Sequence, residues 1–254
     1  MGLSMRTKIY LLFVFLMIGF LVAGCSLLGD VPLPEVLGTP TPEPSPTPLG
    51  STLDFSITDG VYAVSLAPGE SVPGTPLTFI DKADDTIYAV SIAGKEAALQ
   101  DGNSFNWQGI IGPGVTGDYR LNLLPTFNET ALKANGNVFV TIFEPTPKEG
   151  AAPQLTDKTL LFDNMLVDYV VPVSRTIPGT TLIYQSVANN VVTFSGTQGL
   201  PNYTIGDSVL WTGFVRDNIY LQSNLTLKSV ETNGLHVTGS ATLWVFPAAV
   251  TGSP

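Results

Sequence analysis

The sequence predicts an all-β protein in which two tandem copies of one antiparallel β domain follow a targeting segment and a proline-rich tether. Composition is the first indication, because 65 of the 254 residues are Val, Ile or Thr, whose branched side chains favour strands. The second is the alternation of apolar and polar residues with a period of two, as in 118–123 and 225–228. The third is an internal repeat. Each copy, with about 90 residues, is expected to form a small β-sandwich or a partly open barrel.

The N-terminal segment has the pattern of a secretory signal. Arg6 and Lys8 precede fifteen uncharged residues, Ile9–Ala23, which are followed by Gly24 and Cys25. A basic start, a short apolar stretch and small residues at its end are typical of such signals. At about 1.5 Å per residue, the apolar stretch is too short to cross a hydrocarbon core about 30 Å thick.

The string Leu21-Val22-Ala23-Gly24-Cys25 resembles the lipobox of bacterial lipoprotein signal peptides. The resemblance implies that residues 1–24 are removed by cleavage between Gly24 and Cys25, and that the Cys25 sulfur carries a diacylglycerol. It also implies an extracytoplasmic protein, lipid-anchored either to the outer face of the cell membrane or to the outer membrane. The alternative interpretation is that Cys25 ends an ordinary membrane anchor.

Residues 25–50 are predicted to be a tether. Val31–Pro48 contains seven prolines in eighteen residues and neither Lys nor Arg. Such a sequence cannot bury a core and favours the extended polyproline II conformation. We therefore expect a semi-rigid spacer between the membrane and the folded part, with a docking motif for a proline-binding domain as the alternative.

Sequence landmarks recur in the same order in the rest of the chain. Val72–Leu77 returns as Ile177–Leu182, and Gly102–Gly109 returns as Gly206–Gly213. Several landmarks in one order at nearly one offset indicate a tandem duplication.

The repeat also sets the expected domain boundaries. Asn135-Gly136 and Asn233-Gly234 are interpreted as equivalent hairpin turns, because both central positions of such a turn tolerate positive φ. The predicted boundaries are 51–147 for the first β domain, 148–160 for a linker and 161–248 for the second β domain. The alternative is that both copies supply strands to one larger sandwich or barrel.

Composition excludes several classes of protein. One cysteine and one histidine exclude a disulfide-stapled fold, a Cys-rich zinc site and a multi-histidine metal centre. The net charge of −10 excludes a nucleic-acid binder of the usual kind, because the charge repels a polyanion. Asp81, Asp84 and Asp85 could hold calcium, but with Asn189-Asn190 at the equivalent place they are more simply interpreted as Asx-rich hairpin turns. We predict neither a cofactor nor a metal site.

Trp107 and Trp211 are the duplicated aromatic residues that a ligand could use. Each shares its strand face with an apolar residue two positions before it and a glycine two positions after it, Gly109 and Gly213 respectively. This pattern favours a ring in the core with the glycine leaving space beside it. The alternative is a pair of stacking platforms for sugar rings.

Leu210 and Phe214 are candidate interface residues. They lie on the opposite strand face from Trp211, where the first copy has Asn106, Gln108 and Ile110 in place of Leu210, Thr212 and Phe214. Because an apolar outward face usually marks a partner surface, we expect these two side chains to pack between the copies.

Hydrolase motifs are weak in this chain. Gly206-Asp207-Ser208 resembles the Gly-Asp-Ser block of one serine-hydrolase family, with His236 as a conceivable base, but that family has helices around a parallel sheet. Asp118 and Glu129 could form a carboxylate pair only if the fold brings them together.

The sequence therefore predicts a non-enzymatic recognition or assembly module at the cell surface, with a protein or glycan as partner and no catalytic residues. The alternatives are a hydrolase acting on an envelope polymer (glycan or peptide) and a carbohydrate-binding protein.

Overall fold

The computed structural model describes residues 52–126, 129–197 and 199–246, which form an all-β structure of antiparallel sheets. Gly24, Cys25 and the tether at 25–50 lie outside the described residues. Within the described ranges, no helix is long and apolar enough to cross a membrane.

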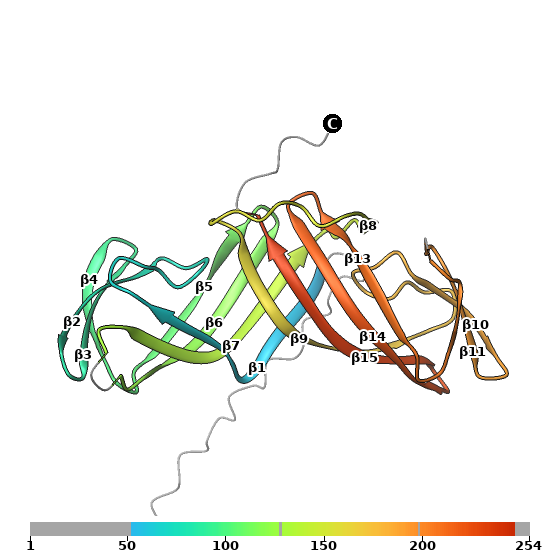
Figure 1. Ribbon diagram of the computed structural model, residues 1–254, viewed down its shortest axis with the longest axis horizontal. Coiled ribbons are helices and arrows are strands. Elements are labelled where there is room, and N and C mark those ends of the chain that lie inside the picture. Colours follow the sequence, from blue (N-terminus) through green and yellow to red (C-terminus); the bar gives the residue numbers. More distant parts are fainter. Residues whose placement is uncertain (1–51, 127–128, 198, 247–254) are drawn as a thin grey trace, which may run out of the picture. The chain divides into compact units, whose positions relative to one another are not determined.

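The first copy consists of a four-stranded sheet and a small three-stranded sheet (Figure 1). The strand order of the larger sheet is β1-β7-β6-β5 and that of the smaller sheet is β2-β3-β4. The strands are β1 (Thr52–Leu66), β2 (Leu77–Asp84), β3 (Ile87–Ile92), β4 (Lys95–Gln100), β5 (Ser104–Gly112), β6 (Val115–Leu124) and β7 (Leu132–Phe143).

The second copy repeats this topology strand for strand. Its larger sheet has the order β8-β13-β14-β15-β9 and its smaller sheet has the order β10-β11-β12. The strands are β8 (Lys148–Glu149), β9 (Leu160–Val171), β10 (Ile183–Ala188), β11 (Val191–Ser195), β12 (Asn202–Thr204), β13 (Ser208–Arg216), β14 (Ile219–Glu231) and β15 (Gly234–Val245). Strand β8, which comes from the segment between the copies, is the one addition.

The repeated segment that begins with Val72 and Ile177 folds into the same turn in both copies. The Thr75 hydroxyl donates to the Val72 carbonyl oxygen at 3.0 Å, and the Thr180 hydroxyl donates to the Ile177 carbonyl oxygen at 2.9 Å. The glycine of each turn has a positive φ, 78° at Gly74 and 76° at Gly179. The sequence repeat is therefore a repeat of backbone conformation.

The prediction that Asn135-Gly136 forms a hairpin turn is wrong, whereas Asn233-Gly234 does connect β14 and β15. Gly136 lies inside β7, and the residue with the equivalent pairing in the second copy is Gly239. A Cβ atom on either glycine would lie 2.0 Å from a carbonyl oxygen of the adjacent strand. The close approach of two backbones, and not a turn, requires glycine at position 136.

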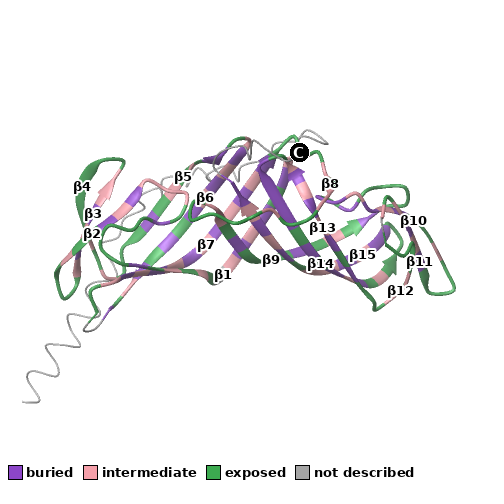
Figure 2. Ribbon diagram, turned by 45° about the horizontal axis from the view of Figure 1, so that its top comes forward, coloured by how far each residue is buried: buried purple, intermediate pink, exposed green. Residues whose placement is uncertain are grey.

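The strands bury alternate residues, as the period of two predicts (Figure 2). β7 alternates buried and half-buried positions along its whole length. The buried side chains of both copies belong to one hydrophobic core, which includes Phe55 and Tyr119 from the first copy and Phe162 and Leu221 from the second.

Contacts between the copies are concentrated where β1 meets β9. The Tyr62 and Phe162 rings stack, and Phe162 also lies 6.4 Å from the Tyr119 ring. Each of the two repeated turns faces the first strand of the other copy: a Cβ on Gly74 would lie 3.0 Å from Leu160, and one on Gly179 would lie 2.9 Å from Leu53.

Polar groups also join the copies. The Asn218 side chain donates to the Pro113 carbonyl oxygen at 3.1 Å, and the Arg216 guanidinium donates to the Phe143 carbonyl oxygen. Both donors come from the β13–β14 hairpin of the second copy, and both acceptors are backbone atoms of the first.

Candidate functional site

Trp211 is part of the core. Its side chain is 2% exposed, and its Nε1 atom donates to the Thr181 hydroxyl oxygen at 3.0 Å. The ring lies beside Gly213, where a Cβ atom would come within 2.9 Å of it. A ring covered in this way offers no open face for stacking on a sugar.

The edge strand β13 beside Trp211 is closed by β8. Glu149 lies opposite Gly213, and its Oε1 atom accepts a hydrogen bond of 3.1 Å from the Thr181 hydroxyl. Thr181 thus connects the indole to a residue of the linker. A Cβ on Gly213 would lie 2.3 Å from the Lys148 carbonyl oxygen, so only glycine lets β8 approach this closely.

Trp107 is less covered than its counterpart. It packs against the core and lies 5.7 Å from the Tyr119 ring, yet the residue remains partly exposed. Within the described residues, its strand β5 is the last of its sheet and has no equivalent of β8. The two tryptophans therefore differ in cover although their strands are equivalent.

A hollow of about 120 Å³ lies beside Trp211, between β13 and the small sheet of the second copy. Glu149, Tyr203 and Leu210 line it together with the indole. The hollow has room for a few water molecules and is too small for a sugar ring with its hydroxyl groups.

Phe214 packs on the linker and not between the copies, which corrects the prediction for this residue. Gly150 lies against its ring, and the Lys148 Nζ atom lies 5.7 Å from the ring centroid. The linker crosses here because Phe214, Tyr220 and Trp244 form a row of neighbouring rings across three strands, with centroids 5.3 Å and 5.5 Å apart. The equivalent row of the first copy, Ile110–Thr116–Thr141–Asp54, is mostly polar.

The prediction that Leu210 packs between the copies is also wrong. Its side chain is 63% exposed and lies at the rim of the hollow beside Trp211. The copies meet through β1 and β9 and at the end of the β13–β14 hairpin, and Leu210 lies in neither contact.

Sequence reasoning missed the outer face of β9. Leu161, Leu166 and Val170 are 53%, 63% and 38% exposed, and all three alternate with buried residues. An extra residue at Asp163-Asn164, where Asn164 has a φ of 56°, forms a bulge that keeps the three on one face. Asp163 and Asp168 lie between these residues on the same face, so the outer face of β9 carries apolar and acidic side chains in turn.

A second hollow, of about 340 Å³, lies between the copies at the β13–β14 hairpin. Glu144, Arg216, Asp217 and Asn218 contribute to its lining. The Lys148 ammonium bonds the Asp217 carboxylate at 2.8 Å, and this hydrogen bond lowers the pKa of Asp217. Because Arg216 and Asn218 bond backbone carbonyls of the first copy and Asp217 pairs with Lys148, the hollow is a polar seam between the copies.

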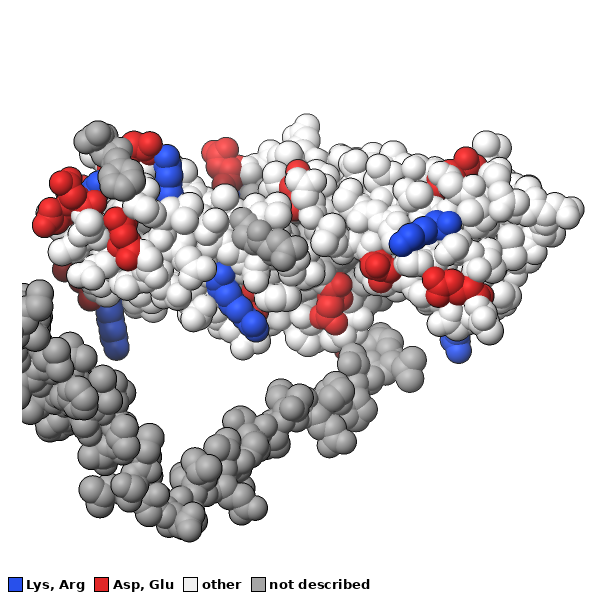
Figure 3. Space-filling model, turned by 90° about the horizontal axis from the view of Figure 1, so that it is seen from below, with Lys and Arg blue, Asp and Glu red and all other residues white. Residues whose placement is uncertain are grey.

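On the face that Figure 3 shows, charged side chains are sparse and lie in small groups separated by uncharged areas. The carboxylates of Asp81 and Asp84 each accept a hydrogen bond from the following backbone amide. Asn189 and Asn190 both have positive φ and form the β10–β11 turn. Within the part of the chain that the structure describes, no three Asp, Glu, His or Cys side chains converge as metal ligands.

The carboxylates named for a hydrolase are engaged in separate ion pairs. Asp118 contacts the Arg120 guanidinium at 2.8 Å, and Glu129 contacts the Lys133 ammonium at 2.6 Å. These are local pairs within β6 and at the start of β7, and they aim neither carboxylate at the other.

His236, on β15 in the larger sheet of the second copy, lies between two carboxylates. Its Nε2 atom lies 2.8 Å from Asp168 and its Nδ1 atom lies 2.9 Å from Glu231. Because both ring nitrogens face carboxylates, the ring is not paired with Ser208, which begins β13. The Ser208–His236 arrangement considered from the sequence is therefore absent from this sheet.

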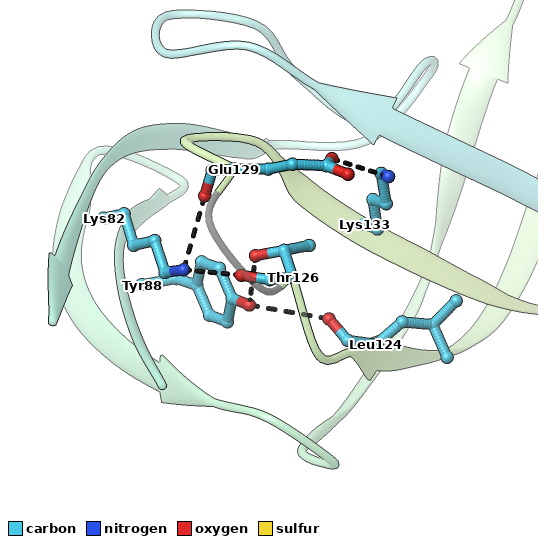
Figure 4. Close-up of polar contacts among 6 residues, drawn as sticks. All are labelled: Lys82, Tyr88, Leu124, Thr126, Glu129 and Lys133. Atoms are coloured by element: carbon cyan, nitrogen blue, oxygen red, sulfur yellow. Dashed lines mark hydrogen bonds and ion pairs between the residues drawn. The ribbon is translucent and has the colours of Figure 1, made fainter. Parts of the chain in front are cut away.

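A buried polar cluster joins the small sheet of the first copy to the β6–β7 connection (Figure 4). The Lys82 ammonium donates to the Thr126 carbonyl oxygen at 2.6 Å and to the Glu129 carbonyl oxygen at 3.3 Å. The Tyr88 hydroxyl bonds the Thr126 hydroxyl at 2.8 Å, and burial raises the pKa of Tyr88. These hydrogen bonds hold the β6–β7 connection against the small sheet of the first copy.

No family model matches the chain, and searches of curated proteins and of solved structures find no match either.

Proposed function

We propose that the protein is a membrane-anchored extracytoplasmic lipoprotein that acts as a non-enzymatic recognition or assembly module. The outer face of β9 would be part of the surface that receives the partner. The observation that carries this proposal is that three exposed apolar side chains, Leu161, Leu166 and Val170, lie on that face, with Asp163 and Asp168 between them.

The comparison between the copies supports a role for this face. Leu161 is equivalent to Asp54. Leu161 on β9 pairs with Trp244, and Asp54 on β1 pairs with Thr141, the counterpart of Trp244. Fully burying a leucine side chain stabilises a complex by roughly 1.5–3 kcal/mol. The partner is expected to be a protein with an apolar surface of its own.

The N-terminal sequence supports the anchored location. Cys25 is the single cysteine of the chain and follows directly after an apolar signal-like segment. A lipid on Cys25 and the tether at 25–50 would hold the β9 face at a fixed range of distances from the membrane.

Site-specific photo-crosslinking in the producing bacterium tests the proposal. A photo-reactive amino acid at Leu166 of the full chain should give a discrete crosslinked product, and Leu161→Asp should reduce its yield. The matched control carries the same photo-reactive residue at Asn122, an exposed position on the outer face of β6 in the first copy. Equal crosslinking at both positions, or none at Leu166, would contradict a partner surface on β9.

A further inference from the structure

The two edge strands β5 and β13 are equivalent, yet only β13 is closed. In the second copy, Lys148 lies opposite Phe214 and Glu149 opposite Gly213. The Thr146 amide donates to the Val215 carbonyl oxygen at 2.8 Å, and the Gly150 amide donates to that of Thr212 at 3.4 Å. Residues 146–150 thus run along β13, with β8 (Lys148–Glu149) as the paired part.

β5 keeps the features that admit such a strand. Gly109 is equivalent to Gly213, the residue whose missing side chain lets β8 approach. A Cβ on Gly109 would lie 2.3 Å from the Trp107 ring, whereas one on Gly213 would meet both the Trp211 ring at 2.9 Å and the Lys148 carbonyl oxygen at 2.3 Å. Ile110, the counterpart of Phe214, is 77% exposed.

The outer edge of β5 also keeps its backbone positions available. In an antiparallel strand, the backbone amide and carbonyl groups of successive residues point to opposite edges of the strand. Because Thr212 and Phe214 face β8, their counterparts Gln108 and Ile110 face away from β6. Within the described residues, β5 ends its sheet, so these two positions line an open edge.

We infer that the β5 edge between Gln108 and Ile111 is a binding site for an extended peptide segment of a partner protein, which adds as an antiparallel strand. The chemistry of the occupant follows from the segment seated on β13. That segment runs Pro145-Thr146-Pro147-Lys148-Glu149-Gly150, with two prolines before the paired residues. We therefore assign to this site a peptide that has prolines before its paired residues and donates backbone amides to β5. The aliphatic part of one of its side chains would lie over Ile110, as that of Lys148 lies by Phe214.

Strand addition fits this edge because main-chain hydrogen bonds supply affinity while side-chain contacts supply selectivity. The bound segment would cover Ile110 and the exposed part of Trp107, as β8 and the linker cover Phe214 and Trp211. This site lies on the first copy and does not depend on the β9 face.

The test uses the full chain in detergent and a fluorescent peptide with the sequence of residues 144–151. Fluorescence anisotropy should show saturable binding, and hydrogen exchange should show new protection at Gln108 and Ile110. The same peptide N-methylated at its Thr and Gly should bind at least about tenfold more weakly, because it lacks the two donors seen in the occupied copy.

Two protein variants complete the test. Gln108→Pro removes an amide that faces the open edge and leaves the β5–β6 pairing, so it should weaken binding by at least about tenfold. Gln108→Thr, which keeps the amide, is the matched control and should bind as the unaltered chain does. The N-methylated peptide keeps the test valid if Gln108→Pro does not fold.

Absence of binding to the full chain would overturn the inference, as would equal binding of the N-methylated peptide or new protection confined to other strands. Binding that appears only after deletion of residues 26–50 would also overturn it, because the occupant would then belong to this chain. Crosslinking at Leu166 together with failure of the peptide would refute this site alone and leave the proposed function intact.

Discussion

Tyr62 of the first copy stacks on Phe162 of the second, with ring centroids 6.4 Å apart and ring planes 26° apart. Phe162 is 1% exposed and also contacts the Tyr119 ring, so one side chain of β9 fills space in the first copy. This relationship makes the stability of the two copies interdependent.

We predict that Phe162→Ala destabilises both copies together. Truncating a buried phenylalanine typically costs about 3–5 kcal/mol, and here the cavity opens at Tyr62 and Tyr119. Urea unfolding followed by Trp107 fluorescence in the first copy and Trp211 fluorescence in the second, in single-tryptophan variants, should give lower midpoints that coincide.

Phe194→Ala is the control, because the Phe194 ring contacts Tyr184 and Tyr203 within the second copy. An unchanged Trp107 midpoint in Phe162→Ala would show that the first copy does not rely on this contact.

Gly179→Ala should destabilise the protein by roughly 1–3 kcal/mol. The new Cβ would lie 2.9 Å from Leu53 of the first copy, and the φ of 76° disfavours an L side chain. Gly69→Ala separates the two causes, because Gly69 has a φ of 89° but nothing within 4 Å of its Cβ position.

Denaturant titration measures both variants. If Gly179→Ala costs no more than Gly69→Ala, the tight contact between Gly179 and Leu53 is not a source of stability.

The fold class and the repeat could be predicted from the sequence because both rest on local patterns. Alternation marks the strands, and Val72–Leu77 and Ile177–Leu182 are local turns whose hydrogen bonds are internal. The Asn135-Gly136 dipeptide led to a wrong prediction because glycine is also needed inside a strand where the backbone of the adjacent strand comes close. Only the pairing of β6 with β7 distinguishes this case from a hairpin turn.

The candidate site depends on long-range contacts and was less predictable. Phe214 was expected to pack against the other copy, but its ring is covered by the linker. The proline content of 145–153 did not indicate that this segment would pair with β13. Leu166 was missed because the bulge at Asp163-Asn164 interrupts the period of two.

High pH should destabilise the fold through three tyrosines near the contact between the copies. Burial raises the pKa of Tyr62 and of Tyr169 to about 12, and raises that of Tyr119 further. The negative charge of Asp54 adds to the effect at Tyr169.

Because these pKa values are higher in the folded state than in the unfolded state, their contribution to stability is present below about pH 10 and is lost as pH rises from about 10 to 12. The loss is roughly 2 kcal/mol for Tyr62 or Tyr169. Urea midpoints at pH 8 and pH 11 should show a smaller difference in Tyr169→Phe. An identical pH dependence in that variant would contradict the assignment.

Cys25→Ala should leave an unprocessed precursor and abolish palmitate labelling, because the thioether requires the Cys25 sulfur. Gel mobility and metabolic labelling after expression in a bacterial host measure both effects. Ser26→Ala, which keeps the sulfur, is the control, and labelling that persists in Cys25→Ala would refute a lipid anchor at this residue.

Hydrogen exchange on the unaltered full chain tests most directly the claim that the equivalent edges of the two copies differ, one closed by the chain itself and one open for a partner. The amides of Gln108 and Ile110 should exchange at least about tenfold faster than those of Thr212 and Phe214, because only the latter face β8. Equal protection at the four positions would contradict the claim, since the β5 edge would then be covered as well.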